Sequence, residues 1–348
     1  MTVSRRIAAL EAYVPGEQPT DTTLVKLNTN ENPYLPSPRV LDALRAEVER
    51  LNRYPAPMAD GLRRAAADLY GVAPEQILVG NGSDELLAIC LRACIEEGGC
   101  VAYAPPTYSL YATLAAIAGA RTLEFPPRRL PPQETFELPA EMFSAKAAVT
   151  LVCHPNSPFG APVALDQIAE LCRRSAGLVV SDEAYVDFGA ASALALLPRH
   201  ENLVVVRTLS KSFSLAGLRL GLLFGAPGLI GQLAKVKDSY NVSRLAIAAG
   251  VAALEDHAWM RANVERVVAT RERVVAALDA RGCFVAPSAA NFFWLECPGE
   301  GGRSVYERLR RHGVLVRFFG DARLRAGVRV TVGTDAEMDR FLAALAEG

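Results

Sequence analysis

The stretch VVVRTLSKSFSLAGLRLG, residues 204–221, decides the fold of this chain and raises the first question about its chemistry. Val204–Val206 is a β-branched apolar run of the kind that fills a buried strand. Ser210 and Lys211 follow this run directly, and Arg219 comes eight residues after the lysine. Most lysines beyond a strand end are solvated surface charges, so Lys211 indicates a site only if other strand ends supply partners.

Similar apolar runs recur along the chain and alternate with helix-like stretches. The runs are QILVG (76–80), CVAYA (100–104), RTLEF (121–125), AAVTLVC (147–153), GLVVSDEAY (177–185) and NLVVVRTLS (202–210), and the helix-like stretches cover 38–51, 83–97, 108–118 and 165–174. This alternation predicts an α/β fold with a mostly parallel sheet covered by helices on both faces. We expect residues 40–249 to form this large domain, with residues 1–39 as an extended N-terminal arm.

The pattern of apolar and polar residues changes in the last hundred residues of the sequence. A long helical stretch begins near Leu245 and runs past Arg271. After it, NFFWLEC (291–297) and VRVTVG (328–333) alternate more, as strands with one exposed face do. We therefore predict a smaller α+β domain over residues 250–348.

Composition excludes several classes of partner. Lysine and arginine number 37 and aspartate and glutamate 38, so the basic excess typical of nucleic-acid binding is missing. No apolar run is long enough to span a bilayer, and Glu11 and Pro15 interrupt the N-terminus too soon for a secretory signal. The seven cysteines and four histidines show no metal-binding spacing. We expect a cytoplasmic protein without a metal and without nucleic-acid or membrane partners.

Polar side chains follow four of the predicted strands at the points where the strands end. They are Asn81-Gly82-Ser83-Asp84 after 76–80, His154-Pro155-Asn156 after 147–153, Asp182 with Tyr185 after 177–181, and Ser210 with Lys211 after 202–207. Ligands of open α/β sheets bind beyond these carboxyl ends. The set contains no P-loop and no serine or cysteine paired with a histidine. It offers instead a lysine, a carboxylate, an amide, a phenol and a helix N-terminus.

This set fits the needs of pyridoxal phosphate. Its aldehyde requires a lysine amine, and its pyridine nitrogen requires a buried carboxylate to stay protonated. Its ring hydroxyl suits an amide and a phenol, and its phosphate suits a helix N-terminus and an arginine. Taken singly, Asp182 could be a structural acid, Asn156 a turn residue, Ser83 a helix cap and Tyr108 a core residue. The acidic Asp84 beside a phosphate site has no explanation in the sequence.

The chain resembles the fold type I pyridoxal-phosphate aminotransferases, and among them it is similar to the histidinol-phosphate aminotransferases of histidine biosynthesis. The motifs that carry the resemblance are YVPG (13–16), LNTNENP (27–33), RYP (53–55), GNGSDE (80–85), HPNSPFG (154–160), DEAYVDF (182–188), SKSFSLAGLRLG (210–221) and VRVTVGT (328–334). Their order covers nearly the whole chain.

The resemblance implies a role for each candidate residue. Lys211 forms the Schiff base and carries the proton, and Asp182 and Tyr185 complete the catalytic set. The implied cofactor-binding residues are Ser83, Asp84, Tyr108, Asn156, Asp182, Tyr185, Ser210, Lys211 and Arg219, with Tyr54 reaching across a homodimer interface to the neighbour's cofactor phosphate. Tyr13, Arg317 and Arg329 are the implied substrate-binding residues.

The implied reaction is the exchange of L-histidinol phosphate and 2-oxoglutarate for imidazole-acetol phosphate and L-glutamate. One arginine pair would serve both substrates, because a guanidinium binds phosphate and carboxylate alike. A surface-facing edge strand is the alternative setting for Arg329. The alternative enzymes are a lyase like the threonine-phosphate decarboxylases and an aromatic amino acid aminotransferase. A further alternative is a regulator without enzyme activity on the same fold. The presence of Lys211 argues against this alternative, because a regulator does not need a Schiff-base lysine.

Overall fold

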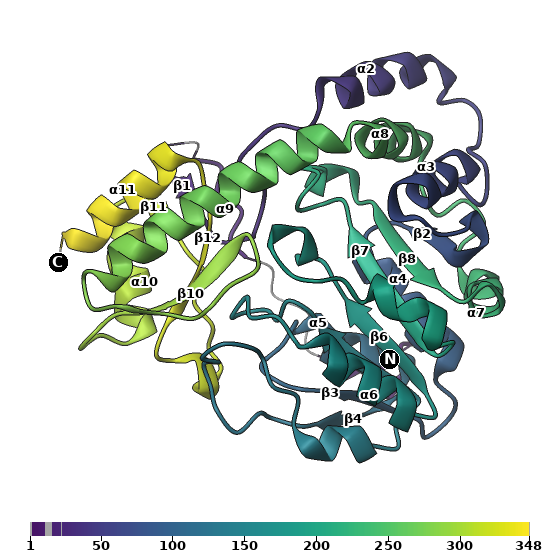
Figure 1. The fold of residues 1–348 in the computed structure, drawn as a ribbon, viewed down its shortest axis with the longest axis horizontal. Coiled ribbons are helices and arrows are strands. Elements are labelled where there is room, and N and C mark those ends of the chain that lie inside the picture. The colour runs from purple at the N-terminus through teal and green to yellow at the C-terminus, as the bar shows by residue number, and fades with distance from the viewer. Residues whose placement is uncertain (1, 11–15, 22, 348) are drawn as a thin grey trace.

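The structure is a computed structural model that describes residues 2–10, 16–21 and 23–347, and Figure 1 shows a large region and a small region of secondary structure. The long helix α9 (His257–Asp279) runs from the helices beside the large sheet into the small region. Short helix α1 (Arg5–Ala8) belongs to the N-terminal arm. Among the described residues, no helix combines the length and apolar character needed to cross a bilayer.

The described part of the large region is built on a seven-stranded sheet with the strand order β2-β8-β7-β6-β5-β3-β4. Its strands are β2 (Ile77–Gly80), β3 (Cys100–Tyr103), β4 (Arg121–Glu124), β5 (Val149–Cys153), β6 (Leu178–Asp182), β7 (Leu203–Thr208) and β8 (Gly221–Gly225). Strand β8 runs antiparallel to both neighbours, and the pairs from β7 across to β4 are all parallel. The predicted α/β class is therefore confirmed.

Helices cover both faces of this sheet, which explains why its central strands are continuous apolar runs. One face packs on α3 (Asp60–Tyr70), α6 (Leu165–Arg174) and α8 (Arg244–Glu255), and the other on α4 (Ser83–Cys94), α5 (Leu110–Ala118) and α7 (Pro227–Leu233). Val205 packs on the first face, while Val204 and Val206 pack on the second. Helix α2 (Pro38–Glu47) lies outside this layer on α8 (Figure 1).

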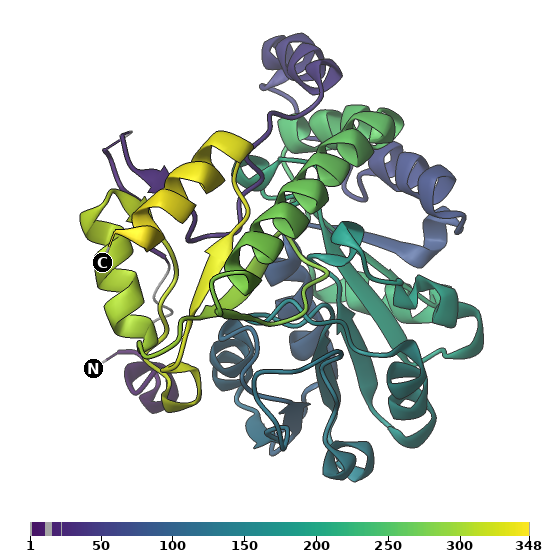
Figure 2. The ribbon, with the colours of Figure 1, turned by 60° about the vertical axis from the view of Figure 1, so that its left-hand side comes forward.

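The small region holds an antiparallel sheet of strand order β12-β10-β9 among the described residues. Its elements are β9 (Phe284–Val285), β10 (Phe292–Glu296), α10 (Gly302–Arg311), β11 (Val314–Leu315), β12 (Val328–Thr331) and α11 (Asp335–Ala346). Strand β1 (Val25–Lys26) of the arm pairs in parallel with β11, and Figure 2 shows it beside α11. The domain boundaries at residues 39 and 249 stay predictions.

Two expectations about the C-terminal part are wrong in detail. The long helical stretch is two helices, because Asp256 leaves the helical conformation between α8 and α9 and accepts a hydrogen bond from the Ser37 hydroxyl. Strand β10 has no exposed face over Phe292–Leu295. Phe293 packs into the core of the small region, while Trp294 packs into the core of the large one, so both faces of β10 are covered.

The remaining regular segments of the described chain are short 3-10 helices. They span Val48–Arg50, Pro74–Gln76, Ala140–Ser144, Val186–Phe188, Ala193–Arg199, Ala216–Leu218, Ala234–Val236 and Ala322–Leu324. The predicted helices over 38–51 and 83–97 end earlier, at Glu47 and Cys94. The sheet register places Cys153 beside Asp182 and Asp182 beside Val206. The ends of three neighbouring strands therefore form one edge, where the candidate residues gather.

Candidate active site

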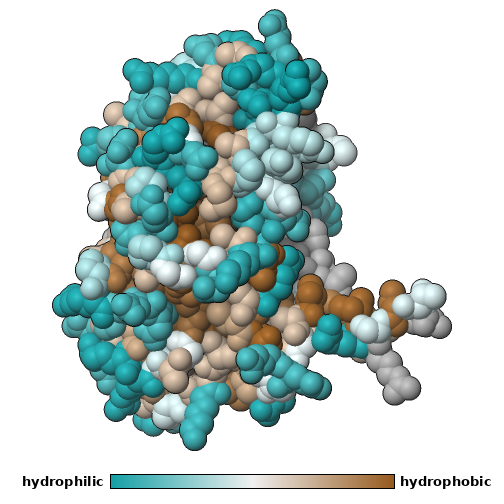
Figure 3. All heavy atoms as spheres, turned by 90° about the vertical axis from the view of Figure 1, so that its right-hand side faces the viewer, coloured by the Kyte–Doolittle hydropathy of each residue, from teal (hydrophilic) through white to brown (hydrophobic). Residues whose placement is uncertain are grey.

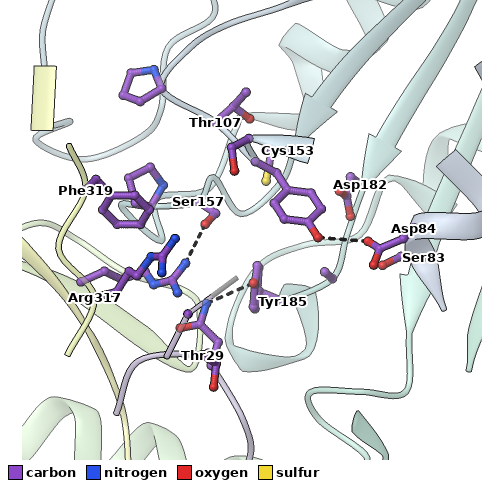
Figure 4. Close-up of a pocket in the computed structure, with 18 of the residues that line it drawn as sticks. Thr29, Ser83, Asp84, Thr107, Cys153, Ser157, Asp182, Tyr185, Arg317 and Phe319 are labelled. Carbon is purple, nitrogen blue, oxygen red and sulfur yellow. Dashed lines mark hydrogen bonds between the residues drawn. The ribbon is translucent and has the colours of Figure 1, made fainter. Parts of the chain in front are cut away.

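A cavity of about 420 Å³ opens at the carboxyl ends of the central strands. Ten of the predicted site residues line it: Ser83, Asp84, Tyr108, Asp182, Tyr185, Ser210, Lys211, Arg219, Arg317 and Arg329. Figure 4 shows Asp84 and Ser83 at one side of this pocket and Arg317 with Phe319 at the other. The pocket thus has a wall from the large region and a wall from the small region.

Lys211 follows β7 and is partly buried in the pocket. Its Nζ donates a hydrogen bond to the Thr29 carbonyl at 3.3 Å. Burial, with Arg329 as a second cause, lowers the pKa of Lys211 to about 8. About a tenth of this amine is therefore neutral at pH 7, far more than at the ordinary lysine pKa, and the neutral form is the one that a nucleophile or a base requires.

Asp182 is the last residue of β6, and its side chain is buried. The Tyr111 hydroxyl donates to its Oδ2 at 2.7 Å, whereas its Oδ1 has no hydrogen-bond partner among the described residues. Burial raises the pKa of Asp182 to about 6. A buried carboxylate oxygen without a partner is costly unless a donor completes it. This oxygen fits a protonated ring nitrogen.

Tyr185 and Asn156 are the phenol and the amide that were predicted at these strand ends. The Tyr185 hydroxyl accepts a hydrogen bond from Asn30 Nδ2 at 3.1 Å. Asn156 is buried, its Nδ2 donates to the Pro106 carbonyl at 3.2 Å, and its Oδ1 has no partner in the described chain. An acceptor of this kind suits a ring hydroxyl. Asn156 itself is not among the residues that line the cavity.

Helix α4 begins at Ser83, and the residue before it, Gly82, lies against the Arg219 guanidinium. Arg219 Nη1 donates to Ser210 Oγ at 3.3 Å, and its Nη2 donates to Asp84 Oδ2 at 3.1 Å. Gly82 has a φ of +85°, which strains any other residue, and a Cβ there would lie 2.7 Å from Arg219 Nη2 and displace this guanidinium. A helix N-terminus beside an arginine is a site for an anion.

Asp84 has a structural role that explains its negative charge at this site. It receives Arg219 on one oxygen and the Tyr108 hydroxyl, at 3.1 Å, on the other. Asp84 therefore holds in place both the arginine and the tyrosine that were predicted to contact the cofactor.

The two arginines of the small region lie side by side across an isolated β-bridge, with backbone hydrogen bonds of 2.9 Å in both directions. Arg329 Nη2 donates to the Asn28 carbonyl at 3.0 Å and Nη1 to Ser157 Oγ at 3.3 Å. Arg329 is on the edge strand β12, but its side chain lines the pocket, so the surface-facing alternative is wrong.

Tyr54, like Asn156, does not line this pocket. Tyr54 is 77% exposed and stacks on Tyr240 with ring centroids 4.4 Å apart. Tyr13 lies outside the described residues.

The sequence analysis missed a segment that crosses the pocket, residues 28–32, which we call the asparagine strap. Its carbonyls accept from Arg329 and Lys211, as described above. Asn30 donates to Tyr185, and Asn32 Nδ2 donates to the carbonyls of Lys211 and Ser212 at 3.0 and 3.2 Å. Three asparagines in five residues were the available signal, since buried asparagines must find hydrogen-bond partners.

Fold and site define a transferase that handles amino groups, and comparison with known proteins agrees. The chain belongs to the family of class I and II aminotransferases, whose model matches residues 22–345. Within that family it is similar to histidinol-phosphate aminotransferases. It is 44% identical over 342 residues to histidinol-phosphate aminotransferase 1 of Nostoc sp., which covers 97% of this chain and 96% of that protein. It is also 44% identical to the Geotalea uraniireducens histidinol-phosphate aminotransferase, covering 99% of this chain and 98% of that protein.

Solved structures show the same fold. The histidinol-phosphate aminotransferase of Sinorhizobium meliloti, in complex with pyridoxal-5'-phosphate, superimposes with a TM-score of 0.89 at 26% identity, covering 99% of this chain and 97% of that chain. An aspartate aminotransferase of Thermus thermophilus, with maleate, gives 0.80 at 22% identity, covering 99% of each chain. The expected fold type I architecture is confirmed.

Proposed function

We propose that this protein is a pyridoxal-phosphate aminotransferase of histidine biosynthesis that exchanges L-histidinol phosphate and 2-oxoglutarate for imidazole-acetol phosphate and L-glutamate. The observation that carries the proposal is one cavity that joins Lys211, a carboxylate oxygen of Asp182 without a partner, and the arginine pair of the small region. The full-length similarity to histidinol-phosphate aminotransferases supports the same substrates.

The residues present fit pyridoxal phosphate. Lys211 would hold its aldehyde carbon, and the unpartnered Oδ1 of Asp182 would hold its ring nitrogen. Tyr185 and Asn156 would hold the ring oxygen, and Tyr108 would cover the ring face. The phosphate would be held by Ser210, Arg219 and the first residues of α4, Ser83 and Asp84, through backbone N–H groups. When bound, this cofactor supplies a sink for the electrons released from the substrate Cα–H bond.

The side chains of the pocket then divide the work. The neutral Lys211 amine would accept the proton from the substrate Cα and deliver it to the aldehyde carbon of the cofactor, because its pKa of about 8 lies near the working pH. Asp182 stays ionised despite its burial when a cationic ring nitrogen lies beside it. Arg317 and Arg329 bind the substrate anion and so orient Cα toward Lys211.

The same arginine pair can serve both substrates in turn. Planar guanidinium groups form paired hydrogen bonds with the phosphate of histidinol phosphate and with a carboxylate of glutamate. Tyr13 is proposed to help close over the phosphate.

A direct assay tests the reaction and its main rival. Purified protein is given histidinol phosphate, 2-oxoglutarate and pyridoxal phosphate, and glutamate is measured. In parallel, threonine phosphate is supplied without 2-oxoglutarate, and carbon dioxide is measured. Glutamate in the first assay supports the proposal. Carbon dioxide in the second with no glutamate in the first would replace the transaminase with a lyase, and faster turnover of phenylalanine or tyrosine would favour an aromatic aminotransferase.

We also propose that the active unit is a homodimer in which Tyr54 reaches the neighbour's cofactor phosphate. Large apolar side chains near Tyr54 are exposed, among them Leu41, Val48 and Leu51. Figure 3 shows a face on which apolar side chains lie between polar ones. Sedimentation should give a dimer. Mixing Tyr54→Phe protein with Lys211→Ala protein should yield more activity than either alone, and a fully active monomer would contradict this arrangement.

The proposed location is the cytoplasm. All seven cysteines are free thiols. Such thiols suit a reducing compartment.

A further inference from the structure

Tyr111 on α5 is buried with none of its surface exposed, and it belongs to none of the roles assigned so far. Its hydroxyl donates to Asp182 Oδ2 at 2.7 Å. The other oxygen of that carboxylate, Oδ1, has no hydrogen-bond partner among the described residues, and Asp182 lines the pocket. Tyr111 therefore occupies one oxygen and leaves the other for the proposed cofactor.

The ring of Tyr111 has a second contact with the same site. It meets the Tyr108 ring edge to face, with centroids 5.8 Å apart and an interplanar angle of 78°. Tyr108 is the residue proposed to cover the face of the cofactor. One buried side chain thus touches both the residue that faces the ring nitrogen and the residue that covers the ring.

We propose that Tyr111 is a positioning residue for the cofactor: its hydroxyl fixes the Asp182 carboxylate as an ionised acceptor aimed at the ring nitrogen, and its ring supports Tyr108. This inference rests on the proposed cofactor site. It adds a residue that acts on the cofactor through Asp182 and Tyr108 rather than by contact.

The electrostatics around Asp182 explain why it needs such a donor. Burial raises the pKa of Asp182, and the negative charges of Asp84 and Glu183 raise it further. The Tyr111 hydroxyl opposes them because it stabilises the ionised carboxylate.

The tyrosine keeps its own proton, since burial and Asp182 raise the pKa of Tyr111 well above its ordinary value. The nearby thiol of Cys153 is also neutral, because burial raises its pKa to about 12. Tyr111 is therefore a donor to Asp182 throughout the physiological pH range.

The variant Tyr111→Phe removes the hydroxyl and keeps the ring. A matched control is Tyr103→Phe, because Tyr103 is also buried and packs on Tyr111, but its hydroxyl donates to Glu124 at 2.8 Å. The Kd of each apoprotein for pyridoxal phosphate is measured by fluorescence between pH 6 and pH 8. We expect Tyr111→Phe to raise the Kd about tenfold or more near pH 6 and less at pH 8. Tyr103→Phe should leave the Kd unchanged.

A double-mutant cycle separates an effect through Asp182 from a general loss of packing. If the hydroxyl acts through the carboxylate, Tyr111→Phe should change the Kd little in an Asp182→Asn background. An equal loss in both backgrounds would overturn the inference, and so would an unchanged Kd in the single variant.

A further measurement uses only wild-type apoprotein and so does not depend on a variant folding. With 13C-labelled aspartate and tyrosine, the Asp182 carboxyl resonance and the Tyr111 Cζ resonance should move with pH at one common midpoint. Separate midpoints, or a Tyr111 signal that does not move, would overturn the inference. Wild-type protein that binds no pyridoxal phosphate would overturn the proposed function and this inference with it. A wild type that binds normally beside an equally competent Tyr111→Phe would overturn this inference alone.

Discussion

The two walls of the pocket are built in different ways. The large-region wall consists of residues at the ends of neighbouring parallel strands, such as Asp182 and Lys211, each held by a buried strand behind it. The small-region wall consists of Arg317, Arg329 and the asparagine strap, joined by a single β-bridge and a few hydrogen bonds between distant segments. The first wall suits a group that never leaves the site. The second suits two substrates that bind alternately.

The walls also differ in charge. Burial brings the pKa of Asp182 up to about 6 and that of Lys211 down to about 8, so both groups of the first wall titrate near neutral pH. The second wall presents two arginines instead. We therefore expect the chemistry, rather than anion binding, to carry the pH dependence.

Lys211→Ala should produce the largest effect, because it removes both the covalent attachment and the proton carrier. We expect glutamate formation to fall by about a thousandfold or more while cofactor binding is only weakened. The control is Lys235→Ala, because Lys235 is exposed and donates a hydrogen bond to the side chain of Gln232. Borohydride reduction of the wild-type protein with its cofactor, followed by peptide mapping, should label Lys211. A label on a different lysine would contradict the role of Lys211 and, with it, the proposed cofactor contacts of the first wall.

Asp182→Asn should come next, with kcat lower by roughly a hundredfold and the fold intact, since an amide cannot keep the ring nitrogen protonated. Near-wild-type turnover would show that Asp182 is structural.

The same variant changes the pH dependence of apoprotein stability. Because the folded-state pKa of Asp182 is raised from 3.8 to about 6, its contribution to stability is present below 3.8 and is lost as pH rises through 6. Thermal unfolding of Asp182→Asn should lack this part of the slope, whereas the part due to Glu183, whose pKa burial raises to about 7, should remain.

Arg329→Ala tests the second wall alone. Each charge-assisted contact is worth about 1.5–3 kcal/mol, so kcat/KM should fall roughly ten- to a hundredfold for histidinol phosphate and for glutamate. Histidinol, which lacks the phosphate, should lose much less, and the Kd for pyridoxal phosphate should change little. The exposed Arg325→Ala is a control. A loss confined to one substrate would show that the arginine pair does not serve both.

Arg329→Ala should also shift the pH profile of the first wall by a smaller amount. Arg329 lowers the pKa of Lys211, so removing it should move that pKa upward from about 8. Covalent capture of pyridoxal phosphate by the apoprotein needs the neutral amine, and its rate should therefore reach its plateau at higher pH in the variant. An unchanged midpoint would mean that Arg329 and Lys211 do not interact.

The difference between the two walls also explains which parts of the site the sequence could predict. Asp182, Tyr185 and Lys211 follow apolar runs, so local pattern and the rule for strand ends were enough to bring them together. The hydrogen bond from Tyr111 to Asp182 joins residues 71 apart, and the bond from Thr331 to Asn30 joins residues 301 apart. Such contacts depend on how helices and chain termini pack, which hydrophobic periodicity does not encode. The burial of both faces of β10 was not predicted, for the same reason.

The smallest predicted effect concerns Asn30, where the two walls meet. Its side chain donates to Tyr185 of the first wall and accepts from Thr331, two residues from Arg329, at 3.0 Å. Its φ is +56°, a left-handed conformation that glycine adopts freely, so Asn30→Gly removes the amide without forcing the backbone. Hydrogen bonds of this kind contribute about 0.5–1.5 kcal/mol, which predicts a loss of about two- to tenfold in kcat/KM for both substrates.

A matched variant shows which bond of Asn30 matters. Thr331→Val removes the small-region partner of both the Asn30 side chain and the Asn30 backbone N–H, and it leaves the bond from Asn30 to Tyr185 in place. If Asn30 acts chiefly by orienting the Tyr185 hydroxyl, the Tyr185 signal should move in Asn30→Gly and stay in place in Thr331→Val. Burial raises the pKa of Tyr185 to about 12 in the presence of this hydrogen bond, and losing the Asn30 donor should raise it further, which NMR of labelled tyrosine can follow. If Thr331→Val costs as much as Asn30→Gly and the tyrosine signal does not move, the strap holds the small region in place and has no separate effect on the first wall.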